Sequence, residues 1–263
     1  MIKKLKKLDT ILQEMNSFVV AFSGGVDSTF LVHRASQLKK VRFSAITITT
    51  PYIPAHEINE AIHFCKENEI DHNVIEVSFP DSIKNNPVER CYLCKKELFA
   101  HINNFASENN FRFVADGTNG DDNLDFRPGL KALKEMSVRS PLQEAGLTKK
   151  EIREASAEAG LPTWDKPSNA CLLTRIPYDT MVTEIDLRKI EQAEQYLFER
   201  GFYGARVRIH GEIARIECMP GYLSRIVNDP DREHIIDNLK KIGFRFISLD
   251  LEGYRTGSMN PDN

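Results

Sequence analysis

Short apolar runs alternate with amphipathic stretches along the first part of the chain. Residues 18–22 form a continuous apolar run that ends at a serine and two glycines, and a helical pattern starts near Asp27. Further strands are expected at 43–49, 74–77 and 111–115, and further helices at 56–68, 95–108 and 149–159. Alternating strands and helices of this length predict an α/β fold with a parallel sheet covered on both faces.

The pattern changes after Gly160, where three prolines within 162–177 interrupt any regular element. Clustered prolines are typical of a linker or lid, so we expect domains at 1–180 and 181–263. The second is expected to contain helices at 183–199 and 232–241 and strands at 205–209, 212–218 and 245–251. These elements predict a small α+β domain.

Composition excludes several classes of protein. The 263 residues are 41% hydrophobic and 28% charged, which is typical of a globular protein. A net charge of −3 disfavours nucleic acid as a partner, and no apolar run approaches the roughly 18 residues of a membrane span. Asp9 and Glu14 interrupt the lysine-rich N-terminus, so we expect no targeting signal. Five cysteines without such a signal favour a reducing compartment, and we expect a cytoplasmic protein.

The strongest chemical signal is the hexapeptide Ser23–Ser28, between an apolar strand and a helix. Glycines allow the backbone to approach a ligand, and a helix start presents unpaired N–H groups to an anion. We therefore expect an oligophosphate to bind there, with Asp27 holding Mg²⁺ against it. The binding candidates are Ser23, Gly24, Gly25, Asp27 and Ser28. The alternative is an ordinary glycine turn capped by serine; neither the Walker nor the dinucleotide-binding glycine pattern is present.

An acidic loop follows the fourth expected strand, from Asp116 to Asp122, with Asp125 and Arg127 close behind. Because ligands in open α/β sheets bind at the carboxyl ends of strands, this loop is expected to face the glycine loop. Its carboxylates could complete a Mg²⁺ shell. The alternative, favoured for any single aspartate, is a solvated turn that caps its own backbone.

Cysteines form a second group. Cys91 and Cys94 open a helix as a Cys-x-x-Cys pair, and Cys171 lies in the proline-rich segment. Thiolates suit zinc and iron–sulfur centres, and the pair also suits a redox dithiol. The residues themselves leave cluster, zinc and redox or structural thiols equally open. Cys65 and Cys218 are expected to be buried apolar residues.

Basic residues give weaker signals. Arg206 and Arg208 lie on one face of an expected strand, and a two-residue turn at 210–211 would place Arg215 opposite Arg206. Such a cluster suits a phosphate or carboxylate, although a solvated sheet face is the favoured interpretation from the residues alone. Lys95 could reach ATP phosphates or be an ordinary surface lysine, and Trp164, the single tryptophan, is expected in the core.

The hexapeptide resembles that of the PP-loop ATP pyrophosphatases. In these enzymes the first loop of a parallel sheet binds the pyrophosphate of ATP, and the resemblance implies cleavage at the α-phosphate to give an adenylated substrate. Four segments, 22–31, 140–153, 160–180 and 249–260, together resemble the LarE family of sulfur transferases, which make the nickel-pincer nucleotide cofactor. This likeness runs from about Val19 to Asn260.

The LarE resemblance assigns roles to the candidate residues. It implies that Cys171 is the sulfur site and that, with Cys91 and Cys94 present, the three bind a [4Fe-4S] cluster rather than using Cys171 as a sacrificial sulfur source. It also implies substrate-binding and acidic residues in the second domain. The nucleotide-binding candidates are Lys95, Arg175, Arg206 and Arg208, and the metal-binding candidates are Glu194 and Glu217.

These assignments imply ATP- and Mg²⁺-dependent conversion of the carboxylates of a pyridinium dicarboxylate mononucleotide to thiocarboxylates. The resemblance further implies a homo-oligomer and a sulfide donor. The alternatives are a tRNA thiolase, sacrificial sulfur transfer from Cys171, an ammonia-using synthetase that needs none of the three cysteines, and a regulatory module with structural zinc.

Overall fold

The structure is a computed structural model that describes residues 1–124, 128–167, 171–228, 230–255 and 259. Contacts divide the chain into two compact units, which we describe separately. The first comprises residues 1–82 and 89–169, and the second comprises 83–88 and 170–263. The expected boundary at residue 180 differs from this division, because residues 170–180 and the short segment 83–88 have their contacts in the second unit.

The first unit is built on a four-stranded sheet with the order β3-β2-β1-β4, and every pairing is parallel. The strands are β1 (Ser17–Ala21), β2 (Arg42–Thr49), β3 (His72–Glu76) and β4 (Phe113–Ala115). In the central strand, Phe18 pairs with Phe43 on one side and Phe113 on the other. The predicted parallel α/β fold is confirmed.

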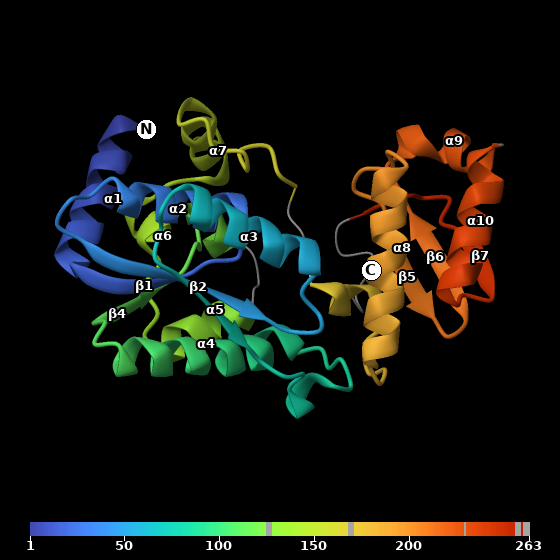
Figure 1. Cartoon of the computed structure of the whole chain (residues 1–263), viewed down its shortest axis with the longest axis horizontal. Helices are drawn as coiled ribbons and strands as arrows, with labels where there is room; N and C mark the ends of the chain where they lie inside the picture. Colours follow the sequence, from blue (N-terminus) through green and yellow to red (C-terminus); the bar gives the residue numbers. More distant parts are fainter. Residues whose placement is uncertain (125–127, 168–170, 229, 256–258, 260–263) are drawn as a thin grey trace. The chain divides into compact units, whose positions relative to one another are not determined.

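Helices cover both faces of this sheet (Figure 1). One face carries α1 (Ile2–Met15), α2 (Val26–Ser36), α3 (Ala55–Glu67), α6 (Pro141–Ala145) and α7 (Lys149–Glu158). The other carries α4 (Arg90–Glu108) and α5 (Pro128–Glu135). Because successive side chains of a strand point to opposite faces, Phe18 and Val20 join the first helix layer and Val19 joins the second.

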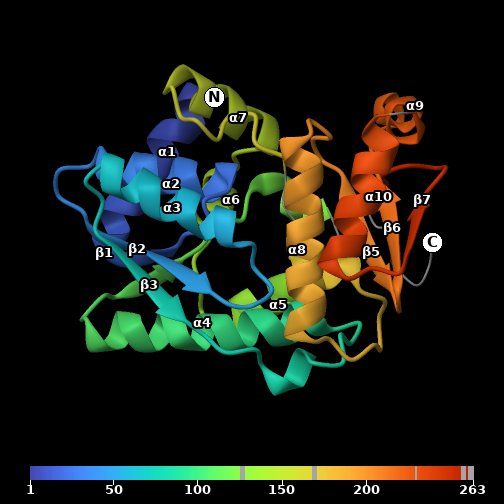
Figure 2. The same cartoon turned by 45° about the vertical axis from the view of Figure 1, so that its right-hand side comes forward.

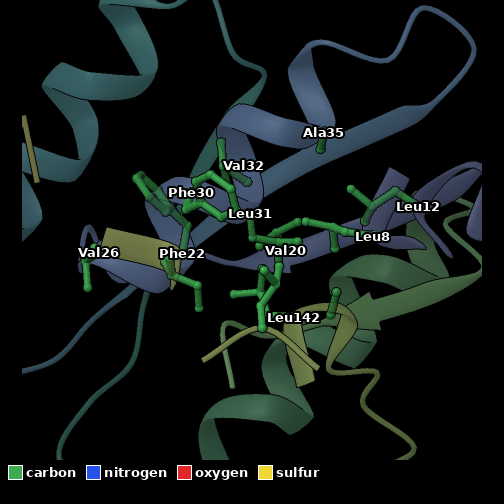
Figure 3. Close-up of a cluster of buried hydrophobic side chains, with 14 of the residues drawn as sticks. Leu8, Leu12, Val20, Phe22, Val26, Phe30, Leu31, Val32, Ala35 and Leu142 are labelled. Atoms are coloured by element: carbon green, nitrogen blue, oxygen red, sulfur yellow. The ribbon is translucent and has the colours of Figure 1, made fainter. Parts of the chain in front are cut away.

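The larger apolar cluster lies under the helix that follows the glycine loop. Phe22, Val26 and Phe30 pack there with α1 and α6, which contribute Leu8 and Leu142 (Figure 3). All five side chains are buried. This packing fixes the end of β1 and the start of α2, and therefore the turn between them.

The second unit contains a three-stranded mixed sheet of β5 (Arg206–His210), β6 (Ile213–Glu217) and β7 (Phe246–Leu249). Its helices are α8 (Glu184–Glu199), α9 (Leu223–Val227) and α10 (Asp231–Ile242), and α8 and α10 lie side by side (Figure 2). Short 3-10 turns occupy Leu172–Arg175 and Pro220–Tyr222. The predicted small α+β unit is confirmed.

The predicted register of the β5–β6 hairpin is wrong, because each residue of β5 pairs two positions farther along β6 than expected. Arg208 lies opposite Arg215, and Arg206 lies opposite Glu217. The two-residue turn is formed by 211–212, because Gly211 has a φ of +60° and tight hairpin turns need a left-handed residue at their first central position. No helix in the described ranges combines the length and apolar character that crossing a bilayer requires.

Candidate functional site

The turn between β1 and α2 forms a closed hydroxyl network. The Ser28 Oγ lies 3.1 Å from the Ser23 Oγ and donates to the Gly25 carbonyl at 3.2 Å. The Ser23 amide in turn donates to the Ser28 Oγ at 3.3 Å. Ser23 is exposed, whereas Ser28 is buried. The network shapes the loop from inside and leaves the Ser23 side chain facing solvent.

Two glycines allow neighbouring elements to approach this loop. Gly24 has a φ of +68°, and a Cβ there would lie 3.2 Å from the Cβ of Ala61 on α3. A Cβ on Gly117, just after β4, would lie 2.9 Å from the Ser28 backbone nitrogen. The structure therefore brings the acidic loop against the glycine loop, as expected from their shared sheet edge.

The start of α2 has the properties of an anion site. The first N–H groups of a helix have no partner within the helix, and the first backbone bond of α2 runs from the Thr29 amide to the Gly25 carbonyl. The N–H groups of Val26, Asp27 and Ser28 therefore precede the helical ladder. Such groups and the positive end of the helix dipole bind phosphate oxygens.

Most carboxylates of the acidic loop bind the protein's own groups. Asp116 accepts hydrogen bonds from the Thr118 and Ser140 hydroxyls at 2.5 and 2.7 Å. Asp122 accepts from the Asn119 amide at 2.9 Å, and Asp121 accepts from a backbone amide of α7. Of these three aspartates, only Asp122 caps its own loop as the turn-capping alternative expects, whereas Asp121 caps α7 and Asp116 binds side-chain hydroxyls. Asp116 and Asp122 are also buried, so the loop is not a solvated turn. Asp125 and Arg127 lie outside the described residues.

Asp27 differs from the acidic loop because one of its oxygens has no partner. Its Oδ2 pairs with the Lys149 Nζ at 2.5 Å, while its Oδ1 is buried and forms no hydrogen bond within the described chain. Burial raises the pKa of the Asp27 carboxyl above its ordinary value, although the hydrogen bond and charge of Lys149 oppose the shift. An orphaned carboxylate oxygen beside a phosphate site fits one ligand of a Mg²⁺ ion, which usually keeps several waters and phosphate oxygens.

Two lysines that contact this loop were not expected from the sequence. Lys149 pairs with Asp27, and the Lys166 Nζ donates to the Gly24 carbonyl at 3.2 Å. Both lie more than 120 residues from their partners along the chain. No local pattern marks them, although Lys149 opens a helix with a capping box from Thr148 to Glu151 that is visible in the sequence.

The Cys-x-x-Cys pair lies in the first turn of α4, as expected. Cys91 is exposed and Cys94 is partly buried, and the Cys94 Sγ lies 3.3 Å from the Tyr52 hydroxyl. Burial raises the pKa of the Cys94 thiol, although the hydrogen bond with Tyr52 opposes the shift. Residues three apart on a helix share a face, so two soft ligands are available to one metal centre.

The remaining residues with an expected position are partly found where the sequence predicted them. The Lys95 side chain passes over Gly129, where a Cβ would lie 2.8 Å from its Cδ. Trp164 lies in the turn 162–165 and is 47% exposed, so the expectation that it fills the core is wrong. Cys65 in the first unit and Cys218 in the second are buried, as expected.

In the second unit, Cys171 precedes the 3-10 turn that carries Arg175. The Arg175 guanidinium is almost completely buried and donates to both carboxylate oxygens of Glu194, at 2.8 and 2.9 Å. Burial opposes the charge on Arg175, but Glu194 and, to a smaller degree, the Cys171 thiolate raise its pKa. The structure therefore places a fixed positive charge close to the Cys171 thiol.

A buried polar network continues from Glu194 along β5 and β6. Arg208 pairs with Glu217 at 2.7 Å, and Arg215 pairs with the same carboxylate at 3.0 Å. Arg206 lies 4.0 Å from Glu194, and burial lowers the pKa of its guanidinium, which Glu194 opposes. A solvated sheet face is excluded, because Arg206, Arg208 and Glu217 are all buried.

The carboxylates of this network already bind arginines. Among the described residues, no group of three or more His, Cys, Asp or Glu side chains is placed to hold a metal ion. Glu194 and Glu217 are therefore positioned as partners of Arg175 and Arg208 in the structure. The assignment of these two glutamates as metal ligands stays a prediction.

The amino-acid sequence is similar to known proteins over nearly its whole length. No protein-family model matches the chain. An uncharacterised protein of Synechocystis is 36% identical over 260 residues, covering 98% of this chain and 97% of the relative. An uncharacterised protein of Methanocaldococcus jannaschii is 36% identical over 258 residues, covering 97% of this chain and 98% of the relative.

A third relative has a named activity. The pyridinium-3,5-bisthiocarboxylic acid mononucleotide synthase of Lactiplantibacillus plantarum is 34% identical over 260 residues, which cover 98% of this chain and 94% of that enzyme. The similarity therefore spans both units of the chain. The chain belongs to the LarE family.

Proposed function

We propose that the protein is an enzyme of nickel-pincer cofactor biosynthesis, an ATP-dependent sulfur transferase that converts the carboxylates of a pyridinium dicarboxylate mononucleotide to thiocarboxylates. The observation that carries the proposal is the full-length relative named as a synthase of the bisthiocarboxylic acid mononucleotide. A carboxylate oxygen is a poor leaving group, so replacing it with sulfur requires prior activation. The glycine loop supports ATP as the activating reagent.

In the activation step, a substrate carboxylate oxygen attacks the α-phosphorus of ATP. The bond to the bridging oxygen breaks, pyrophosphate leaves, and an acyl adenylate remains. The N–H groups at the start of α2, which have no partner within the helix, and the exposed Ser23 side chain would receive the pyrophosphate. The Ser23 hydroxyl would exchange its contact with the Ser28 Oγ for a phosphate oxygen. Asp27 would hold Mg²⁺ through its orphaned Oδ1 and so offset the charge that develops on the leaving group.

In the transfer step, a sulfur nucleophile attacks the activated carbonyl carbon and AMP leaves with the bonding electrons. Cys171 is the sulfur site that we propose, as one of three thiolates that would hold a sulfide-bearing cluster, and it directly precedes the turn that carries the buried Arg175. Cys91 and Cys94 would complete a three-thiol set for a [4Fe-4S] cluster, which when bound would supply a sulfide at its unligated iron. Thiols are the donors that such a cluster requires, and Cys91 and Cys94 supply two of them from one helix. No three metal-ligating side chains are grouped together among the described residues, so the three-thiol set rests on donor chemistry and on the family.

Substrate binding is assigned to the arginines of the second unit. The positive charge of Arg206 is the least neutralised of these. Its guanidinium lies 4.0 Å from the Glu194 carboxylate, whereas that of Arg208 lies 2.7 Å from the Glu217 carboxylate. A buried guanidinium with a distant counter-ion gains most from a phosphate or carboxylate ligand. We therefore propose that Arg206 binds a phosphate or carboxylate of the mononucleotide, while Arg175 and Arg208 keep the neighbouring carboxylates in place through their ion pairs.

The test uses anaerobically purified protein with ATP, Mg²⁺, sulfide and the pyridinium dicarboxylate mononucleotide. AMP, pyrophosphate and thiocarboxylate are measured separately, together with protein-bound iron. The triple variant Cys91→Ala, Cys94→Ala, Cys171→Ala is expected to form pyrophosphate and the acyl adenylate, from which water releases AMP and the starting carboxylate, but no thiocarboxylate. Cys65→Ala, which removes a thiol buried away from α4, is the matched control and should retain every product.

Three outcomes would contradict the proposal in different ways. Thiocarboxylate formation by the triple variant would show that the cysteines do not deliver sulfur. Thiolation of tRNA in place of the mononucleotide would identify a tRNA thiolase. Iron-free protein that thiolates once per chain would identify Cys171 as a sacrificial sulfur source and remove the cluster.

A further inference from the structure

Lys166 connects the end of the α7 region to the glycine loop. Its Nζ donates to the Gly24 carbonyl at 3.2 Å and pairs with the Glu60 Oε2 on α3 at 2.6 Å. The Lys166 side chain is 16% exposed, whereas the Glu60 side chain is 56% exposed. The ammonium group thus lies at the rim of the loop, between backbone on one side and a solvent-facing carboxylate on the other.

The backbone of Lys166 is held independently of its side chain. Arg153 on α7 donates to the carbonyl oxygens of Trp164 and Lys166, each at 2.7 Å. The helix that carries Arg153 is in turn fixed by a capping box between Thr148 and Glu151. Only the end of the Lys166 side chain therefore needs to move if its ammonium group leaves Glu60 and binds another anion.

The two lysines that contact the loop differ in how firmly their partners hold them. Lys149 pairs with Asp27, whose side chain is 21% exposed, while the partner of Lys166 is more than half exposed. Ion pairs between exposed groups are weak, because water and salt screen them. The ion pair between Glu60 and Lys166 is therefore weak, and breaking it to release the Lys166 side chain costs little free energy.

Among the described residues that contact the loop, each positive charge is matched by one carboxylate, Lys149 by Asp27 and Lys166 by Glu60. Pyrophosphate adds several negative charges at the start of α2 and needs a cation that can turn toward it. Lys166 already touches the loop at Gly24 and can exchange Glu60 for a phosphate oxygen, which forms stronger charge-assisted hydrogen bonds.

We propose that Lys166 is a phosphate ligand of the glycine loop, which leaves Glu60 and donates to the β- or γ-phosphate of ATP and then to the departing pyrophosphate. This inference rests on the proposed function, because it takes the loop to be the pyrophosphate site. AMP lacks both of these phosphates. Lys166 therefore contributes to binding of ATP and pyrophosphate but not to binding of AMP.

The experiment compares binding of pyrophosphate and of AMP, each with Mg²⁺, by isothermal titration calorimetry of the full chain. Lys166→Met is expected to weaken pyrophosphate binding roughly tenfold to a hundredfold, the range of a hydrogen bond to a charged group, and to leave AMP binding unchanged. Lys166→Arg should recover part of the loss. Glu60→Gln should strengthen pyrophosphate binding by about two- to fivefold, because the competing ion pair is gone. Lys150→Met, on α7 with an 87% exposed side chain, is the matched control and should bind both ligands normally.

Equal loss of pyrophosphate and AMP binding in Lys166→Met would show that the lysine only supports the loop, and would overturn the inference. Unchanged pyrophosphate binding in that variant would overturn it as well. If the wild-type protein binds neither ligand, the nucleotide chemistry of the proposed function fails and this inference fails with it. The wild-type titrations therefore separate the two cases.

Discussion

Gly117→Ala is expected to damage both the stability of the first unit and its anion site. The new Cβ would lie 2.9 Å from the Ser28 nitrogen, 3.2 Å from the Ser28 Cα and 3.3 Å from the carbonyl carbon of Asp27. All three are backbone atoms of the first turn of α2, so no flexible side chain can move aside. Either α2 or the loop after β4 must shift.

The size of the effect follows from this crowding. Overpacking of a well-packed site costs about 1–3 kcal/mol. For a unit of this size each kcal/mol lowers Tm by roughly 2–4 °C, so a decrease of about 2–12 °C is expected. A displacement of the N–H groups by a few tenths of an ångström should weaken pyrophosphate binding roughly tenfold, which corresponds to losing about one hydrogen bond to a charged group.

Thermal unfolding followed by circular dichroism and titration with pyrophosphate check the two effects. Gly221→Ala is the matched control, because a Cβ there meets nothing within 4 Å and its φ is ordinary. Its Tm should change by less than about 2 °C, as for a surface substitution. A Gly117→Ala protein with the Tm and pyrophosphate affinity of the control would refute the close packing of the two loops.

Three further predictions concern buried and titratable groups. Glu217→Gln should lower the free energy of unfolding by about 3–5 kcal/mol in urea denaturation, because it removes the carboxylate of the buried Arg208; an unchanged midpoint would contradict the ion pair. Iodoacetamide should modify exposed Cys91 first and Cys65 last, since burial raises the pKa of Cys65 to about 12, and peptide mass spectrometry would expose the reverse order. Hydrogen bonds from a lysine side chain and from helix-capping groups hold the pKa of Glu151 at about 2, below its unfolded value of about 4.5. The stabilisation that these bonds give the folded state is therefore lost as the pH falls from about 4.5 to 2. Glu151→Gln should make the free energy of unfolding less dependent on pH over this range.

Sequence alone determined the alternation of strands and longer helices, the parallel sheet and the position of the glycine loop, whereas the short helices α5, α6 and α9 were not expected. These features depend on periodic apolar positions and on residues close together in the chain, such as Ser23 and Ser28, which bond each other within one turn. The LarE family was also recognisable from short segments, and the full-length relatives show it. The Cys-x-x-Cys pair at the start of α4 belongs to the same local class of signal.

Tertiary structure alone decided which charges meet. The pairing of Asp27 with Lys149, the contact of Lys166 with Gly24 and the exposure of Trp164 join or separate segments that no local pattern relates. The hairpin register depended on which residue adopts a left-handed backbone, a choice that the sequence His210-Gly211 left open. The ion pairs share one physical reason: burial makes an isolated charge or polar atom costly, and the partner that removes this cost is chosen by three-dimensional packing, not by distance along the chain.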